Sequence, residues 1–134
     1  MEASGRRWVS RLTAEAIHFG LVRDFGGMRG IRDAEALESA LARPQHRASY
    51  DADADLASLA ASYCFGIVRG HPFNDGNKRT GFVVMAVFLR RNGLSLDAPE
   101  PEVVTHMLDL AAGTLTEDEL AAWVRSRSRP VAST

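Results

Sequence analysis

The sequence predicts an all-α fold, a compact single-domain helical bundle around one central buried helix. Apolar residues recur at intervals of three or four through most of the chain, and residues that cap or stop helices bound the segments with this spacing. Nothing in the sequence resembles two strands joined by a turn, as a paired sheet would require. Because 134 residues is the size of one domain, we expect a single domain over residues 1–134, with loose ends at about 1–10 and 126–134.

The first two helices are predicted from their caps and their apolar spacing. Thr13 can cap a helix that runs to about Phe25, where the pair Gly26-Gly27 ends it. Asp33 can cap a second, shorter helix, and Pro44 ends it because the residue before a proline avoids helical backbone angles. The expected inward-facing residues of these two helices are Ile17, Leu21, Phe25, Leu37, Ala40 and Leu41.

The third and fourth helices carry the longest apolar stretches. One runs from about Asp55 to Gly70 and must be largely buried. The other runs from about Asn77 to Asn92, and we expect it to be the central helix because its stretch FVVMAVFL is apolar on all sides. The valines of this stretch also suit a strand, but its length and the Asn-Gly stop after it favour a helix. The buried stripe of the third helix is expected to contain Leu56, Leu59, Ala60, Tyr63, Cys64 and Ile67.

Two shorter helices complete the predicted bundle. The fifth runs from about Pro101 to Ala112, with Gly113 as its stop. The sixth begins at a capping box formed by Thr116 and Glu119. Leu115 and Leu120 flank this box as a hydrophobic staple, and the inward residues expected on the two helices are Val103, Val104, Met107, Leu110, Trp123 and Val124.

Composition excludes several classes of function. A net charge of -1 gives no field that would attract nucleic acid or an anionic membrane surface, so we expect neither as a direct partner. The single cysteine, Cys64, cannot build a disulfide framework or a zinc site and is expected to be a small buried apolar residue. No apolar run reaches the roughly 18 residues that span a bilayer, and the first residues lack an apolar signal core. We therefore expect a cytoplasmic protein.

The polar stretch HPFNDGNKRTG, residues 71–81, separates the third helix from the fourth. A helix N-terminus presents unpaired backbone N–H groups and a partial positive charge, so the start of the fourth helix is a candidate anion site. Lys78 and Arg79 oppose the helix dipole there by up to about 1 kcal/mol each. Unless both side chains extend into solvent, a bound polyanion such as a nucleotide phosphate would offset this cost. Gly76 permits a sharp turn and a close approach of the ligand, and Asn77 either caps the helix or turns its amide toward a phosphate.

Three further residues of the stretch have a structural and a functional interpretation. Asp75 either bonds the free amides of the next helix or holds Mg²⁺, which keeps most of its waters and needs one or two carboxylates. His71 is either a hydrogen-bonded structural residue or a general base that takes a proton from a hydroxyl. Phe73, the one large apolar residue of the stretch, is expected to anchor it in the core. Together these residues suit the transfer of a phosphorus-containing group to a hydroxyl. The other histidines, His18, His46 and His106, are expected to be structural or exposed.

The stretch HPFNDGNKR fits every position of the signature H-x-F-x-[DN]-[AG]-N-[GK]-R, and by it the sequence resembles the Fic/Doc family. The lysine form of the signature matches the Doc toxin branch, the partners of Phd-type antitoxins. Similarity to that branch extends to FGGMRGIRDAEALESALARP before the signature and to FLRRNG and TLTEDELAAWV after it. The resemblance therefore covers nearly the whole chain.

The resemblance implies a kinase that uses ATP and Mg²⁺ and transfers the γ-phosphate to a threonine of translation elongation factor Tu, which arrests protein synthesis. Matched residue by residue to the signature, His71 is the base that deprotonates the target hydroxyl, and Asp75 is the Mg²⁺ ligand. Asn74 either contacts the phosphates or completes the turn. The groups that hold the phosphates are the Gly76 amide, Asn77, Lys78 and Arg79.

Two departures from the Fic branch of the family bear on the reaction. Lys78 replaces the second glycine of the Fic signature, and Phe82 stands where Fic members that transfer AMP carry a second arginine. Both changes favour the kinase over the alternative, an AMP transferase that modifies a protein hydroxyl. A second alternative is a binding module that inhibits translation by occupancy without catalysis. The polar segment from Gln45 to Asp53 is either a docking loop for the target or an ordinary surface loop.

Overall fold

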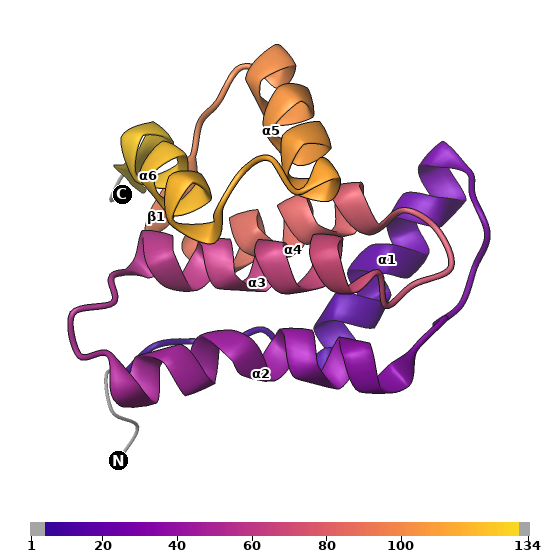
Figure 1. Cartoon of the computed structure of the whole chain (residues 1–134), viewed down its shortest axis with the longest axis horizontal. Coiled ribbons are helices and arrows are strands. Elements are labelled where there is room, and N and C mark those ends of the chain that lie inside the picture. Colours follow the sequence, from indigo (N-terminus) through magenta and orange to yellow (C-terminus); the bar gives the residue numbers. More distant parts are fainter. Residues whose placement is uncertain (1–4, 132–134) are drawn as a thin grey trace.

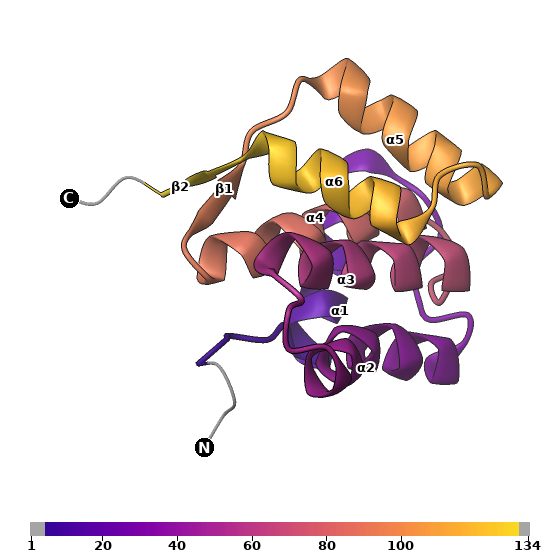
Figure 2. The same cartoon turned by 60° about the vertical axis from the view of Figure 1, so that its left-hand side comes forward.

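A computed structural model of the chain describes residues 5–131, and within them six helices dominate the architecture (Figures 1 and 2). The predicted all-α class is confirmed, with one small exception: β1 and β2 pair antiparallel, Leu94 opposite Pro130, although the sequence predicts no sheet. Within residues 5–131 no helix is long and apolar enough to cross a membrane. The elements are α1 (Arg11–Phe25), α2 (Ala34–Tyr50), α3 (Leu56–Gly70), α4 (Asn77–Arg91), β1 (Leu94–Leu96), α5 (Glu100–Ala112), α6 (Glu117–Arg127) and β2 (Ser128–Pro130).

The central helix is α3, and the prediction that the fourth helix would take this place is wrong. Ten of the 15 residues of α3 are buried, against seven of 15 in α4. Figures 1 and 2 show α3 between α2 on one side and α5 and α6 on the other, with α4 packed along it. Phe82 and Val83 of α4 are only half-buried because they line a cavity rather than the core. Gly66 permits the close contact of α3 with α2, since a Cβ there would lie 3.0 Å from the Ala40 Cα.

The structure places several helix ends differently from the prediction. Ser10, not Thr13, is the N-cap of α1, because its side chain accepts a hydrogen bond from the Thr13 amide. Pro44 does not end α2, which continues to Tyr50 with the proline buried in its interior. A proline inside a helix costs about 3 kcal/mol, so the packing of the apolar face of α2 outweighs that cost. Most of the polar segment 45–53 is consequently helical rather than a loop. In α5 the first residue is Glu100 rather than Pro101.

Other predicted caps are confirmed. Asp33 caps α2 and Asp55 caps α3 through their side chains. Thr116 and Glu119 form the complete capping box of α6. Gly113 ends α5 in a left-handed conformation, as its position predicts.

Two predicted inward faces are partly wrong. The buried residues of α1 are Ala14, His18 and Val22, one position on from the predicted stripe, and Phe25 is 61% exposed. In α5, Met107 and Leu110 are buried, but Val104 is 52% exposed. Both errors have one cause: the outward-lying apolar residues of α1 and α5 border the same cavity. The inward residues predicted for α2, Leu37, Ala40 and Leu41, are all buried.

The described parts of the two expected loose ends are held by the rest of the chain. The Val9 amide donates to the Tyr63 hydroxyl at 2.9 Å, and the Arg7 amide donates to the Asn92 side chain. Residues 126–127 belong to α6, and residues 128–130 form β2. The remaining residues of those two predicted ends, 1–4 and 132–134, lie outside the described part of the chain.

Candidate functional site

The loop of residues 71–76 joins the C-terminus of α3 to the N-terminus of α4. Its first residue, His71, has φ 51° and ψ 53°, the one left-handed conformation among the non-glycine residues of the described chain. Its last residue, Gly76, has φ 73° and is the N-cap of α4, and no side chain caps this helix. The first amides of α4 are therefore left without the capping bond that Asp33, Asp55 and Thr116 provide elsewhere, which is the condition for an anion site.

Asn77 holds the loop closed from inside. The residue is 5% exposed, and its side chain accepts a hydrogen bond from the Phe73 amide at 3.0 Å and donates to the Phe73 carbonyl at 3.0 Å. It also lies 3.1 Å from Nδ1 of His71. Because an amide nitrogen can only donate, Nδ1 accepts this bond, and a neutral His71 carries its proton on Nε2. The Asn77 side chain thus fixes both the turn and the tautomer of His71.

Phe73 and His18 hold the loop against the core. Phe73 is 1% exposed, as its predicted role as an anchor requires. Its ring stacks on that of His18, with 3.9 Å between the centroids and 8° between the planes. Nε2 of His18 lies 2.8 Å from the carbonyl oxygen of Asp75. His18 is therefore structural, as expected, but it belongs to the site, whereas His106 stacks on Trp123 elsewhere and His46 is exposed on α2.

The segment between α1 and α2, residues 26–33, runs beside the loop. The amides of Arg32 and Asp33 donate to the Pro72 carbonyl, at 2.7 and 3.0 Å, and the Asn74 amide donates to the Gly30 carbonyl at 3.0 Å. The Asn74 side chain donates to the carbonyl of Arg29 at 2.9 Å, so it completes the turn. We refer to residues 26–33 as the bracing segment. Sequence reasoning missed its role, although its three glycines were a signal of close backbone approach.

The Asp75 carboxylate is held by two backbone amides. Oδ2 accepts from the Met28 amide at 3.1 Å, and Oδ1 accepts from the Gly76 amide at 3.1 Å. These two bonds, first that from Met28 and then that from Gly76, lower the pKa of the Asp75 carboxyl below its ordinary value and so further favour the ionised form that an aspartate has at neutral pH. Each carboxylate oxygen accepts more than one bond, and the remaining lone pairs are available to a cation.

The donor set around Asp75 fits Mg²⁺ better than a transition metal. Within residues 5–131 no group of three or more His, Cys, Asp or Glu side chains could together hold a metal ion. A zinc site requires such a group, whereas Mg²⁺ keeps several waters and binds through one or two carboxylates and the phosphates of a substrate. One ionised carboxylate beside an anion site meets that requirement.

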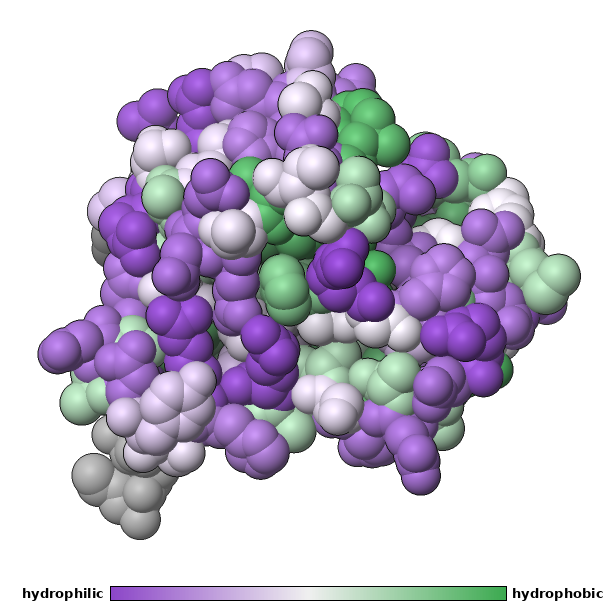
Figure 3. Space-filling model, viewed as in Figure 1, coloured by the Kyte–Doolittle hydropathy of each residue, from purple (hydrophilic) through white to green (hydrophobic). Residues whose placement is uncertain are grey.

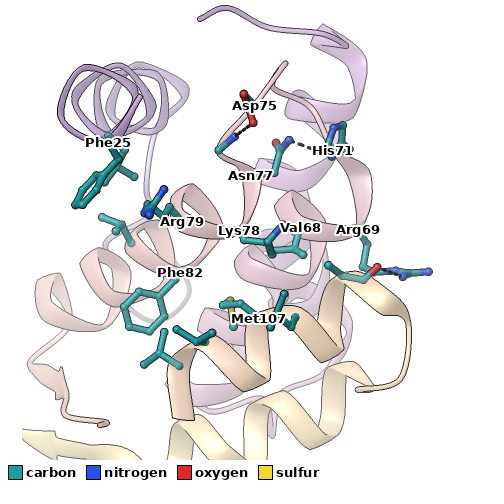
Figure 4. A pocket seen from close by; sticks show the side chains of 17 residues that line it. Phe25, Val68, Arg69, His71, Asp75, Asn77, Lys78, Arg79, Phe82 and Met107 are labelled. Atoms are coloured by element: carbon teal, nitrogen blue, oxygen red, sulfur yellow. Dashed lines mark hydrogen bonds between the residues drawn. The ribbon is translucent and has the colours of Figure 1, made fainter. Parts of the chain in front are cut away.

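A cavity of about 790 Å³ opens over the loop, a size within the ordinary range for small-molecule sites. Figure 3 shows a largely hydrophilic face with apolar residues gathered in a recess beside α5. Figure 4 shows the polar residues of the loop and α4 facing a wall that includes Phe82 and Met107. The Arg79 guanidinium lies 4.3 Å from the centroid of the Phe25 ring. The apolar part of the lining is Leu21, Phe25, Val68, Phe82, Val83, Val103, Val104, Met107, Leu108 and Ala111.

The cavity brings together most of the candidate residues proposed from the sequence and adds one cation that was missed. Asn74 lies outside the lining because its side chain faces the bracing segment. The added cation is Arg69, which donates to the carbonyls of Leu110 and Ala111 at the end of α5. Arg69 stands two residues before His71, and its position in the last turn of α3 favours a purely structural interpretation. The predicted residues that line the cavity are His71, Asp75, Gly76, Asn77, Lys78 and Arg79.

Comparison with known proteins identifies the family of the chain. Residues 8–89 match the model of the Fic/DOC family, and the chain belongs to that family. It is 37% identical over 102 residues to "Protein kinase doc" of Escherichia phage P1, an alignment that covers 75% of this chain and 76% of the relative. It is 40% identical over 75 residues to "Toxin Doc" of Mycolicibacterium smegmatis, covering 55% of this chain and 58% of that relative. The resemblance drawn from the signature is thereby confirmed.

Proposed function

We propose that the protein is the toxin of a toxin–antitoxin pair and acts as a protein kinase in the bacterial cytoplasm. It transfers the γ-phosphate of ATP to a Ser or Thr hydroxyl of a translation factor, with elongation factor Tu as the first candidate, and so arrests translation. A Phd-type antitoxin holds it inactive. The names of the two relatives support the toxin and kinase parts of this proposal. The observation that carries it is one cavity that contains an uncapped helix N-terminus, an ionised carboxylate and a histidine.

The phosphates of ATP lie on the α4 side of the cavity. The uncapped amides at the start of α4 donate to phosphate oxygens, and Lys78 and Arg79 add two full positive charges at the same place. The stacking of Arg79 on Phe25 limits the directions in which its guanidinium can point. The Asp75 carboxylate would hold Mg²⁺, which when bound neutralises part of the phosphate charge.

His71 serves as the general base. In the neutral ring the lone pair that accepts a proton is on Nδ1, so the target hydroxyl replaces the one Asn77 N–H that donates there, while the two bonds of Asn77 to Phe73 still hold the loop. The hydroxyl oxygen forms a bond to the γ-phosphorus while its proton passes to Nδ1. The bond from the γ-phosphorus to the oxygen that bridges it to the β-phosphorus breaks, and ADP leaves with that electron pair.

The position of Phe82 favours transfer of phosphate over transfer of AMP. Phe82 lines the cavity with an apolar ring at the place where AMP-transferring members of the family carry a cation. Lys78 adds a long side chain where those members have glycine. The cavity thus lacks the phosphate clamp that a second arginine would provide. The Lys78 side chain also partly fills the space that a glycine would leave open beside the backbone.

Two labelled nucleotides separate these reactions. Incubation of the pure protein with a bacterial translation extract and γ-labelled ATP is expected to label one protein, whereas α-labelled ATP leaves it unlabelled. His71→Ala is expected to reduce the labelling by a factor of roughly 10² to 10⁴. His46→Ala, an exposed histidine on α2, is the matched control and retains full labelling. Label from the α position would establish AMP transfer instead, and growth arrest that persists in His71→Ala without any label would establish a non-catalytic inhibitor.

A further inference from the structure

His18, on the middle of α1, makes two contacts with the loop and is 4% exposed. Its ring stacks on Phe73, and its Nε2 is bonded to the carbonyl oxygen of Asp75 at 2.8 Å. Because a carbonyl oxygen can only accept, Nε2 carries the proton and donates it. A stack alone needs only an aromatic ring, so the hydrogen bond is the contact that requires a histidine.

The hydrogen bond from His18 sets the orientation of one peptide unit. In a trans peptide the C=O and the following N–H point in opposite directions. The carbonyl of Asp75 points toward His18 in the core, so the amide of Gly76 points away from it. That amide donates to Oδ1 of the Asp75 side chain, which places the carboxylate toward the cavity that it lines.

Gly76 makes this orientation easy to lose. A glycine adopts positive and negative φ with similar ease, so the unit between Asp75 and Gly76 can rotate unless something holds it. Rotation would turn the carbonyl oxygen toward the cavity and the amide toward the core. The carbonyl oxygen, an acceptor, would then face the anion site, and the carboxylate would lose one of its two amide bonds.

We propose that His18 is a positioning residue that holds the Asp75–Gly76 peptide in the orientation required for binding of a Mg²⁺–nucleotide complex. His18 acts through the peptide and touches no reacting group. The inference rests on the proposed function in its choice of ligand, while its statement about the peptide stands on the contacts of His18 alone.

Two substitutions separate the stack from the hydrogen bond. His18→Phe keeps an aromatic ring against Phe73 but removes the donor to Asp75. His18→Gln removes the stack but places an amide donor near the position of Nε2. His106→Phe is the matched control, because His106 also stacks on an aromatic ring and is bonded to a backbone carbonyl, that of Glu102.

The first measurement is the amide signal of Gly76 in the NMR spectrum of the ¹⁵N-labelled full chain, without nucleotide. In His18→Phe we expect this signal to shift strongly or to split, while His18→Gln and His106→Phe leave it close to the wild-type position. An unchanged Gly76 signal in folded His18→Phe overturns the proposal. So does a signal that moves equally in His18→Gln, because the stack would then hold the turn.

The second measurement is calorimetric titration with Mg²⁺ and ADP. Loss of a residue that orients a metal ligand typically weakens binding by roughly 10- to 100-fold, and we expect that loss in His18→Phe, with His18→Gln within roughly threefold of wild type. Equal binding by His18→Phe and wild type overturns the positioning role. A wild-type protein that binds no nucleotide overturns the proposed kinase instead, and the Gly76 signal still decides the role of His18.

Discussion

Gly27 determines how closely the bracing segment approaches Asp75. Its φ of +113° is one that residues with a side chain rarely adopt, and a Cβ there would lie 3.1 Å from Oδ2 of Asp75. Gly26 has φ +88°, but a Cβ there would meet nothing within 4 Å. A side chain at position 26 would therefore introduce backbone strain alone, whereas one at position 27 would introduce strain and also crowd the Asp75 carboxylate.

Substitution of these two glycines by alanine is expected to have different effects on activity. Each costs about 1–3 kcal/mol of stability through backbone strain. Gly27→Ala also displaces Asp75, so it should reduce kcat/KM for phosphate transfer by roughly tenfold or more, whereas Gly26→Ala leaves it near the wild-type value. Urea unfolding measures the stability and the labelled-ATP assay the activity. Equal activity of the two variants would show that contact between Gly27 and Asp75 does not matter.

Phe73 is expected to be the residue on which the stability of the loop depends most. Phe73→Ala removes a fully buried ring and its stack on His18, and we expect a loss of about 3–5 kcal/mol in the free energy of unfolding. Phe19→Ala is the control, because that ring is 53% exposed, and it should cost less than about 1 kcal/mol. Urea unfolding of both variants checks this. A similar cost for both would mean that the loop is not anchored through Phe73.

Residues of the site were predictable from the sequence where the functional side chains lie close together along the chain. His71, Asp75 and Lys78 are neighbours in one stretch, and the start of the helix predicted after them assigns them to a common anion site. His18 lies 57 positions before Asp75, and nothing in its own helix indicates that it faces the loop. The apolar wall from α5 was misassigned for a related reason: an apolar residue facing a cavity has the same helical spacing as one facing the core.

The helices were predictable from periodicity and caps, but their ends depend on which of several polar residues makes the capping bond. Thr13 and Ser10 are both good N-caps by type, and the structure selects Ser10, whose side chain accepts from the Thr13 amide. The rule that a proline ends a helix predicts a stop at Pro44, but the packing of the apolar face of α2 outweighs it and the helix continues. Local rules therefore locate a helix better than they locate its two ends.

The N-terminus of α1 allows a direct test of the corrected cap. Ser10→Ala removes the acceptor for the Thr13 amide and is expected to cost about 1 kcal/mol, within the range of about 0.5–2 kcal/mol for N-caps. Thr13→Ala leaves that bond in place and loses only the contact of its hydroxyl with Ser10, so it should cost clearly less. The two free energies of unfolding, measured side by side, distinguish these caps. A larger loss in Thr13→Ala would restore the cap predicted from the sequence.

Across the whole molecule, the loop of the site is held from three directions. α1 contributes His18, the bracing segment contributes its backbone, and α4 contributes Asn77. None of these contacts is strong alone, since a hydrogen bond adds about 0.5–1.5 kcal/mol net. Because all three sets of contacts favour the same backbone conformation, together they give the loop a single conformation, with the uncapped end of α4 open to the cavity.

The start of the central helix is tied to α6 by a pair that makes the stability of the molecule depend on pH. Asp55 caps α3 through its bond from the Ser58 amide and accepts two hydrogen bonds from Arg125, at 2.7 and 3.0 Å. The Arg125 guanidinium, and to a lesser extent the Ser58 groups, hold the pKa of Asp55 well below its usual range. The folded-state pKa therefore lies below the unfolded value of about 3.9. The contribution of the pair to stability is complete above about pH 4 and is lost as the pH falls through the folded-state pKa.

Asp55→Asn keeps a good capping residue but removes the charge. At pH 7 it is expected to lower the free energy of unfolding by about 0.2–1 kcal/mol, the range for exposed ion pairs, because both side chains are about half exposed. As the pH falls from about 4 toward 2, the stability of the wild type should decrease more steeply than that of the variant, so the two curves converge.

Asp97→Asn, at a looser and more exposed pair with Arg129, is the control and should leave the stability at pH 7 nearly unchanged. Urea unfolding at several pH values gives both curves. A constant difference between wild type and Asp55→Asn at every pH would mean that the charge of Asp55 contributes nothing and that the cap alone is important.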